Sequence, residues 1–85
     1  MLPIGHENYV KKDDIVSITQ PDNAPAKRLR QRADEERMVV NATNGRRTRS
    51  IIVMKSNHIV LSSIQPKVLI SRLENMKHQE RSQQN

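Results

Sequence analysis

The 85-residue sequence contains no cysteine, phenylalanine or tryptophan, and its single tyrosine is Tyr9. The absence of cysteine excludes disulfide bonds and fits a cytoplasmic protein. Without large aromatic side chains, a chain of this length cannot fill a generous core by itself. Small domains that lack disulfides gain stability from metals or partner subunits, so we expect a single domain that forms homo-oligomers.

Long apolar segments are also missing. No stretch of the sequence approaches the roughly 20 apolar residues that a membrane-spanning helix requires. The beginning of the sequence has no charged start followed by a long apolar run, which a secretory signal would show. We therefore expect a soluble, intracellular chain that does not bind a membrane.

The formal charge of +6 arises in the second part of the sequence. Up to Gly45 there are seven basic and seven acidic residues, whereas the eight Lys and Arg residues after it face only Glu74 and Glu80. A regional basic excess favours a polyanionic partner, through counterion release from phosphate or attraction to an anionic surface.

Within this basic part, Gly45-Arg46-Arg47-Thr48-Arg49 places three guanidinium groups directly before a run of β-branched residues. Guanidinium is planar, permanently charged and bidentate, so a cluster held by its backbone can grip phosphate oxygens or guanine edges. The alternative is a solvated basic turn, which is common on soluble proteins. Together with the charge distribution, the motif predicts that Arg46, Arg47 and Arg49 contact nucleic acid.

One helix is predicted to begin at Asp22-Asn23-Ala24-Pro25 and to run to about Glu36. Asp or Asn caps a helix, and proline is tolerated in its first turn because the missing N–H has no partner there. The apolar stripe of this helix is narrow and consists of three residues at helical spacing, so the helix needs a sheet or another subunit beneath it. The stripe residues are Ala26, Leu29 and Ala33.

The basic residues of this helix allow two interpretations. Arg30 stands four residues before Asp34, at a spacing that favours an ion pair on a solvated helix surface. Lys27 and Arg28 lack an acidic partner at that spacing, except near the helix start. We therefore consider Lys27 and Arg28 additional candidates for contact with an anionic partner.

Short β-prone runs account for most of the remaining chain. The first two form an opening hairpin or a pair of strands, and Asn44-Gly45 favours positive φ angles and a hairpin between the next two. A second helix is expected to begin at Pro66. The expected strands are Tyr9–Val10, Ile15–Thr19, Met38–Val40, Ser50–Met54 and His58–Ile64.

These elements predict an α+β fold consisting of a small antiparallel β-sheet with two helices. We assign residues 1–75 to one domain and residues 76–85 to a polar, disordered tail. The segment Ile51–Met54 is apolar at every position. Such a strand is covered on both faces, by a helix on one and by a second layer or another subunit on the other.

Enzymatic readings have little support in the sequence. His6, His58 and His78 are dispersed, and the carboxylates occur in runs that are more often solvated than catalytic. We expect a hydrogen-bonding role for His58 near a turn. No spacing typical of zinc ligands is present. The sequence therefore predicts no catalytic residue, metal or cofactor.

Three collinear segments stand out, namely residues 17–28 (SITQPDNAPAKR), 41–49 (NATNGRRTR) and 56–66 (SNHIVLSSIQP). They resemble the bacterial RemA family of extracellular-matrix regulators, and the likeness extends almost without gaps from Ile4 to Leu73. The resemblance implies a small α+β protein that binds double-stranded DNA and activates transcription of biofilm-matrix genes, without catalytic activity. It also implies a closed homo-oligomeric ring of roughly seven or eight subunits.

Carried onto this sequence, the family's pair of DNA-contacting arginines falls on Arg46 and Arg47, and Arg49 follows the same pattern. Asp14 stands where RemA proteins typically carry a basic residue, so that part of the DNA surface is expected to be shifted to Lys12 or lost. Arg37 replaces the glycine that typically ends the first helix. This replacement is expected to cost the left-handed cap unless the helix finishes in another way.

Two other classes of function remain open from sequence. An RNA-binding module would use the same arginines, although the chain lacks the aromatic residues that stack on single-stranded bases. A scaffold would use its apolar strands for assembly and its basic rim to bind an acidic protein. If DNA is the partner, we expect readout of shape and backbone, strengthened by repetition of the site around a ring.

Overall fold

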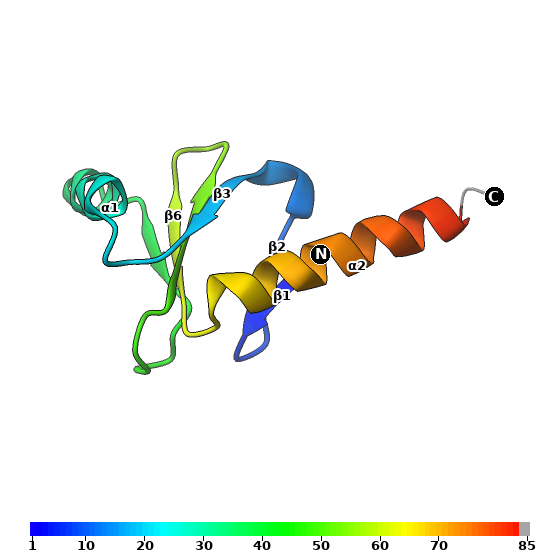
Figure 1. Cartoon of the computed structure of the whole chain (residues 1–85). Helices are drawn as coiled ribbons and strands as arrows, with labels where there is room; N and C mark the ends of the chain where they lie inside the picture. The colour runs from blue at the N-terminus through cyan, green and yellow to red at the C-terminus, as the bar shows by residue number, and fades with distance from the viewer. Residues whose placement is uncertain (84–85) are drawn as a thin grey trace.

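A computed structural model of the chain describes residues 1–83, with side chains for residues 1–77. The predicted α+β class is confirmed, and the two helices lie on opposite sides of the strands (Figure 1). In chain order the elements are β1 (Leu2–Gly5), β2 (Asn8–Val10), the 3₁₀ helix η1 (Lys12–Asp14), β3 (Ile15–Thr19), α1 (Ala24–Glu35), β4 (Val39–Asn41), β5 (Ser50–Met54), β6 (Ile59–Ser62) and α2 (Pro66–Gln83).

The main sheet has the strand order β3-β5-β6-β4 and is mixed. β5 pairs antiparallel with β3 and with β6, whereas β4 pairs parallel with β6. The prediction of a purely antiparallel sheet is therefore wrong. The cause is α1, which carries the chain from β3 at one edge to β4 at the other edge and leaves these two strands pointing the same way.

The structure also corrects both predicted hairpins. β2 pairs with β1 and not with β3, so the hairpin at the start of the chain lies one strand earlier. β4 and β5 are not neighbours in the sheet, because β6 lies between β4 and β5. The positive φ angles predicted at Asn44 and Gly45 are present, at 54° and 79°. Eight residues separate β4 from β5. They do not close a tight hairpin, and the first and last of them donate backbone hydrogen bonds to β6.

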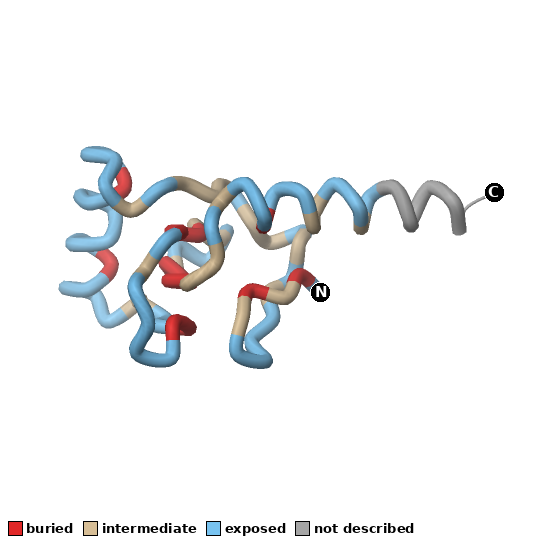
Figure 2. The backbone as a smooth tube through the Cα atoms, turned by 60° about the horizontal axis from the view of Figure 1, so that its bottom comes forward, coloured by how far each residue is buried: buried red, intermediate tan, exposed pale blue. Residues whose placement is uncertain are grey.

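The core has two layers, one on each face of the sheet. α1 covers one face, where its Ala26 and Ala33 pack in a cluster with Ile51 and Leu61. The β1–β2 hairpin and α2 cover the other face, in a cluster that includes Ile52. Figure 2 shows these buried positions in the interior of the fold, while most of α1 is exposed. The prediction that Ile51–Met54 is covered on both faces is confirmed.

Both ends of α1 are closed by hydrogen bonds. Asn23 caps the helix, and its side-chain oxygen accepts from the Ala26 N–H at 3.4 Å. At the other end Arg37 has a φ of 58°, and Met38 N–H donates to the Ala33 carbonyl at 2.8 Å. Arg37 N–H donates to the Asp34 carbonyl at 3.1 Å, which completes a Schellman motif. The left-handed cap is therefore kept although glycine is absent.

The second helix lies along the face of the β1–β2 hairpin (Figure 1). Its Leu69 is completely buried, and Arg72 Nη1 donates to the Pro3 carbonyl at 3.0 Å. The segment predicted as a tail, residues 76–85, falls within α2 as far as Gln83, and its last two residues lie outside the described part. Over the described residues, neither helix has the length and apolar character to span a membrane.

Candidate nucleic-acid interface

Residues 42–49, here called the arginine loop, connect β4 to β5 and carry the three predicted arginines. Both ends of the loop are bound to β6. Ala42 N–H donates to the Leu61 carbonyl at 2.9 Å, and Arg49 N–H donates to the Ser62 carbonyl at 2.8 Å. The loop therefore begins and ends on the central part of the sheet, which fixes where its side chains emerge.

The bend within the loop is also held by local hydrogen bonds. The side-chain oxygen of Asn41 accepts from the Thr43 N–H at 3.0 Å and from the Thr43 hydroxyl at 2.6 Å. Thr43 is buried, and its carbonyl accepts from the Arg46 N–H at 3.1 Å. Arg46 and Arg47 follow this anchored bend and are exposed. Their backbone is thus ordered before any partner binds, which lowers the entropy lost on binding.

Two buried serines tie the loop to the start of α2. The Ser50 hydroxyl donates to the Ile64 carbonyl, and the Ser62 hydroxyl donates to the Ile4 carbonyl at 2.8 Å. Ser62 also accepts from the Ile64 N–H at 3.1 Å. The bonds to Ile64 satisfy backbone groups between β6 and α2, and the bond to Ile4 adds a link to β1. The arginine loop and the α2 N terminus therefore hold a fixed relation to each other.

A groove of about 640 Å³ lies where the arginine loop meets the N-terminal regions of α1 and α2. We call it the basic groove. Its lining includes four cationic side chains, Lys27, Arg47, Arg49 and Lys67, and one carboxylate, Asp22. Helix N termini carry partial positive charge, so both helices add to the attraction of an anion. The remaining lining residues are Gln20, Pro21, Thr48, Gln65 and Pro66.

The structure brings some of the predicted site residues together and separates others. Lys27, Arg47 and Arg49 line the basic groove. Arg46 is exposed on the arginine loop, and Arg28 is exposed on α1; neither lines the groove. Lys12 lies far from these residues along β3, as the strand register shows.

That register defines the two ends of the sheet. Thr19 pairs with Ile51 at the end that carries the arginine loop, here called the groove end. Ile15 pairs with Met54 at the opposite end, and Lys12 belongs to η1 directly before Ile15. Asp14 lies at this opposite end as well, so the substitution of a basic residue there leaves the basic groove unchanged.

Lys67 was missed by the sequence reasoning. It is the second residue of α2 and faces the groove beside residues that precede it by about 20 positions. A lysine following a helix-initiating proline was the available signal, because such a residue lies next to a helix N terminus. Its proximity to the arginine loop depends on the tertiary fold and is not visible in local spacing.

The arginines of the loop make no ion pair with an acidic side chain among the described residues. Three uncompensated guanidinium groups on one short loop create a local positive potential. Each can donate two parallel hydrogen bonds to a phosphate group. The arrangement is therefore suited to binding a polyanion along the groove end of the sheet.

Among the described residues, the side-chain hydrogen bonds of His6 and His58 are to serine hydroxyls. His58 Nδ1 lies 2.7 Å from the Ser56 hydroxyl, which confirms the structural role predicted for His58. His6 Nε2 lies 3.4 Å from the Ser63 hydroxyl. Over the described part of the chain, no three His, Asp or Glu side chains are grouped to hold a metal ion.

Comparison with known proteins agrees with the resemblance described above. Residues 1–73 match the RemA-like family, described as extracellular matrix regulatory protein A-like. A protein of Geobacillus sp. is 49% identical over 72 residues, which cover 85% of this chain and 83% of the relative. A protein of Carboxydothermus hydrogenoformans is 42% identical over 79 residues, covering 93% and 91%.

A third relative, from Fervidobacterium nodosum, is 44% identical over 72 residues, covering 85% of this chain and 77% of the relative. All three are provisionally named regulatory proteins. The names and the family indicate a regulatory role rather than an enzymatic one. The extent of the match and the level of identity show that the chain belongs to the RemA-like family of extracellular matrix regulatory proteins.

Proposed function

We propose that this protein is a transcriptional regulator that binds double-stranded DNA through the arginine loop and the basic groove. The single observation that carries the proposal is the convergence of Lys27, Arg47, Arg49 and Lys67 on one groove beside two helix N termini. Phosphate is the anion that such a set of donors suits best, because arginine binds it in a bidentate manner and lysine as a point charge.

In this proposal the groove follows one DNA strand, while Arg46 and Arg47 at the bend reach the backbone or the base edges. Anchoring of the bend by Asn41 and Thr43 supports the proposal, because ordered donors lose little entropy on binding. The chain's one tyrosine cannot form a stacking platform for bases, and direct base reading in this proposal comes from Arg46 or Arg47 or is minor. Shape and backbone readout therefore dominate.

One subunit provides too few phosphate contacts for tight binding at physiological salt. We propose that several copies form a closed ring, so that the basic grooves repeat around its rim and the DNA bends along it. Repetition raises the overall affinity without any new kind of contact. The regulated genes in this proposal are those of the extracellular matrix, in an activating sense and in the cytoplasm, consistent with membership of the RemA-like family.

The test compares the wild-type protein with the Arg46→Ala/Arg47→Ala variant. Fluorescence anisotropy of labelled duplex DNA is measured at two salt concentrations, after light scattering has shown equal oligomeric masses. Loss of two charged hydrogen bonds, each worth about 1.5 kcal/mol or more, should weaken binding by at least about 100-fold. Wild-type affinity should also fall steeply with salt. Equal binding by both proteins, or a shallow salt dependence, would contradict the proposal.

The alternative function is an oligomeric scaffold for RNA or for an acidic protein, which could use the same cationic groove. Competition separates these partners. Unlabelled duplex DNA should displace the labelled duplex at lower concentration than duplex RNA or polyglutamate does. If polyglutamate competes as well as DNA, the scaffold becomes the better explanation.

A further inference from the structure

The two edges of the main sheet leave apolar surface uncovered in complementary places. α2 packs mainly over β3 and the hairpin, whereas α1 packs mainly over β6 and β4 on the other face. The two layers are thus displaced toward opposite edges, as Figure 1 shows with α1 and α2 at opposite ends of the molecule. Each edge is covered on one face and open on the other.

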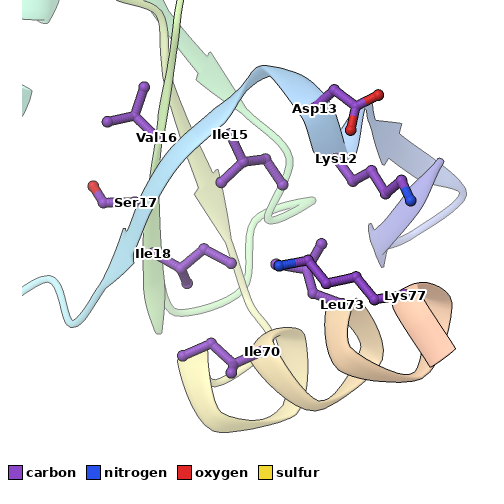
Figure 3. Close-up of a pocket in the computed structure, with 9 residues that line it drawn as sticks. All are labelled: Lys12, Asp13, Ile15, Val16, Ser17, Ile18, Ile70, Leu73 and Lys77. Carbon is purple, nitrogen blue, oxygen red and sulfur yellow. The ribbon is translucent and has the colours of Figure 1, made fainter.

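At the β3 edge, an apolar groove of about 400 Å³ opens between β3 and α2 (Figure 3). Ile15 and Ile18 line it from the strand, and Ile70 and Leu73 line it from the helix. Val16 on the same strand is 62% exposed, and Ile70 is 43% exposed. We call this surface the β3 groove. Its polar lining residues are Lys12, Asp13, Ser17 and Lys77.

The β4 edge presents an exposed apolar side chain, that of Val40, on the same face of the sheet as the β3 groove. Val40 pairs with Val60 in the parallel register, and paired residues point to the same face of a sheet. Val60 belongs to the cluster beneath α2, so Val40 lies on the α2 side, where α1 does not cover it. Val40 is 48% exposed. β4 therefore presents an apolar side chain on the face where β3 presents an apolar groove.

Neither edge has the features that protect a free strand edge. The sequences of β3 and β4, IVSIT and VVN, contain no charged residue and no proline. Monomeric proteins commonly block such edges with lysine or proline, because unpaired backbone groups bind other strands. β3 and β4 also point in the same direction, since β3 and β6 are both antiparallel to β5 and β4 is parallel to β6.

The charges that precede the two strands are opposite in sign at equal distances. If β4 of one copy lies parallel to β3 of the next, the residues before each strand come to the same end of the joint. Counted back from the first strand residue, Ile15 or Val39, the facing pairs are Asp13 with Arg37, Lys12 with Glu36, and Lys11 with Glu35. Such complementarity favours this alignment over its reverse.

We propose that the β3 groove binds the β4 edge of a second copy of this chain, so that the sheet continues from one subunit to the next. The inference rests on the ring assembly proposed above, and it does not depend on DNA binding. Because the two contacting surfaces differ, the interface is head-to-tail and repeats until the ring closes. Val40 enters the groove between β3 and α2, and the α1 of each copy extends over the exposed face of its neighbour's β3.

Cross-linking tests the interface directly, since the natural chain has no cysteine. In the Ile70→Cys/Val40→Cys variant, mild oxidation should produce covalent oligomers of more than two chains, because Ile70 lines the β3 groove that Val40 of the next copy enters. The Ile70→Cys and Val40→Cys single variants should remain uncross-linked under the same conditions. Dimers formed by Ile70→Cys alone would indicate a two-fold symmetric contact between two β3 grooves and would overturn the proposal.

A second measurement uses oligomeric mass, determined by sedimentation velocity. Val40→Arg should reduce the mass to that of a single chain, whereas Val68→Arg should leave it unchanged. Val68 is a matched control because it is 41% exposed and does not line the β3 groove. Equal masses for the two variants, or a wild-type protein that remains monomeric at every concentration, would exclude the interface.

Charge reversal distinguishes the proposed alignment from other contacts between the same edges. Lys11→Glu and Glu35→Lys should each weaken assembly, and their combination should restore part of it. No restoration would contradict the parallel alignment. A monomeric wild-type protein that still binds duplex DNA would remove this interface and leave DNA binding intact, so the two proposals fail separately.

Discussion

The two ends of the main sheet both carry charged residues, but they arrange them differently. At the groove end, four cations gather around one groove and Asp22 is the carboxylate among its lining residues. At the opposite end, acidic and basic residues occur together in the segments before β3 and β4. The cations at the groove end suit the polyanionic partner proposed above, whereas the mixed charges at the opposite end suit the proposed contact between copies.

The comparison also shows that charge along the sequence differs from charge in space. The basic excess follows Gly45 in the sequence, yet Lys55 from that part lies at the opposite end, where its N–H donates to the Asp14 carbonyl at 2.7 Å. Lys27, from the electrically neutral part, lines the basic groove. The groove is thus assembled from three separate segments.

The largest effect that separates the two ends is expected at their serines. Ser62→Ala removes a buried hydroxyl that bonds to the backbone of Ile4 and Ile64. Leaving these groups unpaired should lower the free energy of unfolding by about 2–3 kcal/mol. Ser56 at the opposite end is exposed, and in the described part of the chain its side chain bonds only to His58. Ser56→Ala should therefore change the free energy of unfolding by less than about 0.5 kcal/mol.

Urea denaturation of both variants at one protein concentration measures this difference, because assembly makes stability depend on concentration. Equal losses for Ser62→Ala and Ser56→Ala would mean that the buried hydroxyls do not stabilise the groove end.

A smaller effect is expected on DNA affinity from single lysines. Lys67→Gln removes a groove cation and should weaken duplex binding about tenfold, with a fall of about one in the salt slope. Lys55→Gln is the matched control, because Lys55 is exposed at the opposite end. The affinity of the Lys55→Gln variant for duplex DNA should change by less than about twofold. The salt dependence of anisotropy titrations checks both values, and equal effects would show that only the total charge matters.

Glycine at the groove end gives the next prediction. Gly45 has a φ of 79°, and a Cβ added there would meet no atom within 4 Å. Gly45→Ala should therefore cost only the backbone strain of a left-handed residue, about 1 kcal/mol. Thermal unfolding should show the loss, and DNA affinity should fall only in proportion to the unfolded fraction. A much larger loss of affinity would mean that alanine redirects Arg46 and Arg47.

Local features of this fold could be predicted from sequence, whereas the partners of most strands could not. The α1 cap and the double-sided strand β5 follow from residue type and pattern, and both are present. β1 was missed because Pro3 and Gly5 are unfavourable in strands. The turn at Asn44-Gly45 gave the correct φ angles and the wrong hairpin, since turn chemistry fixes the bend but not the strand that follows beside it.

In the candidate site, too, the locally encoded part could be predicted from sequence and the part that depends on tertiary contacts could not. The arginine loop could be predicted because its charges are adjacent in the sequence, next to a turn signal. The participation of Lys67 could not be predicted, because long-range contacts, including the bonds of Ser50 and Ser62, place the α2 N terminus beside the loop. These serines look like ordinary strand residues, and their role depends on long-range backbone positions that no local pattern encodes.

The smallest expected effect concerns Arg37, which occupies at the opposite end the left-handed conformation that Gly45 occupies at the groove end. Its φ of 58° strains an L-residue, while the Schellman bonds from Met38 and Arg37 keep the helix closed. Arg37→Gly should relieve this strain and raise the free energy of unfolding by about 0.5–1 kcal/mol.

The same substitution should weaken the proposed interface, because Arg37 faces Asp13 of the next copy there. Arg37→Gly should therefore stabilise the subunit while weakening assembly, which urea denaturation and sedimentation velocity measure separately. If the variant gained stability and assembled as well as the wild-type protein, the charge of Arg37 would have no part in the joint, and the left-handed arginine would remain without a physical reason.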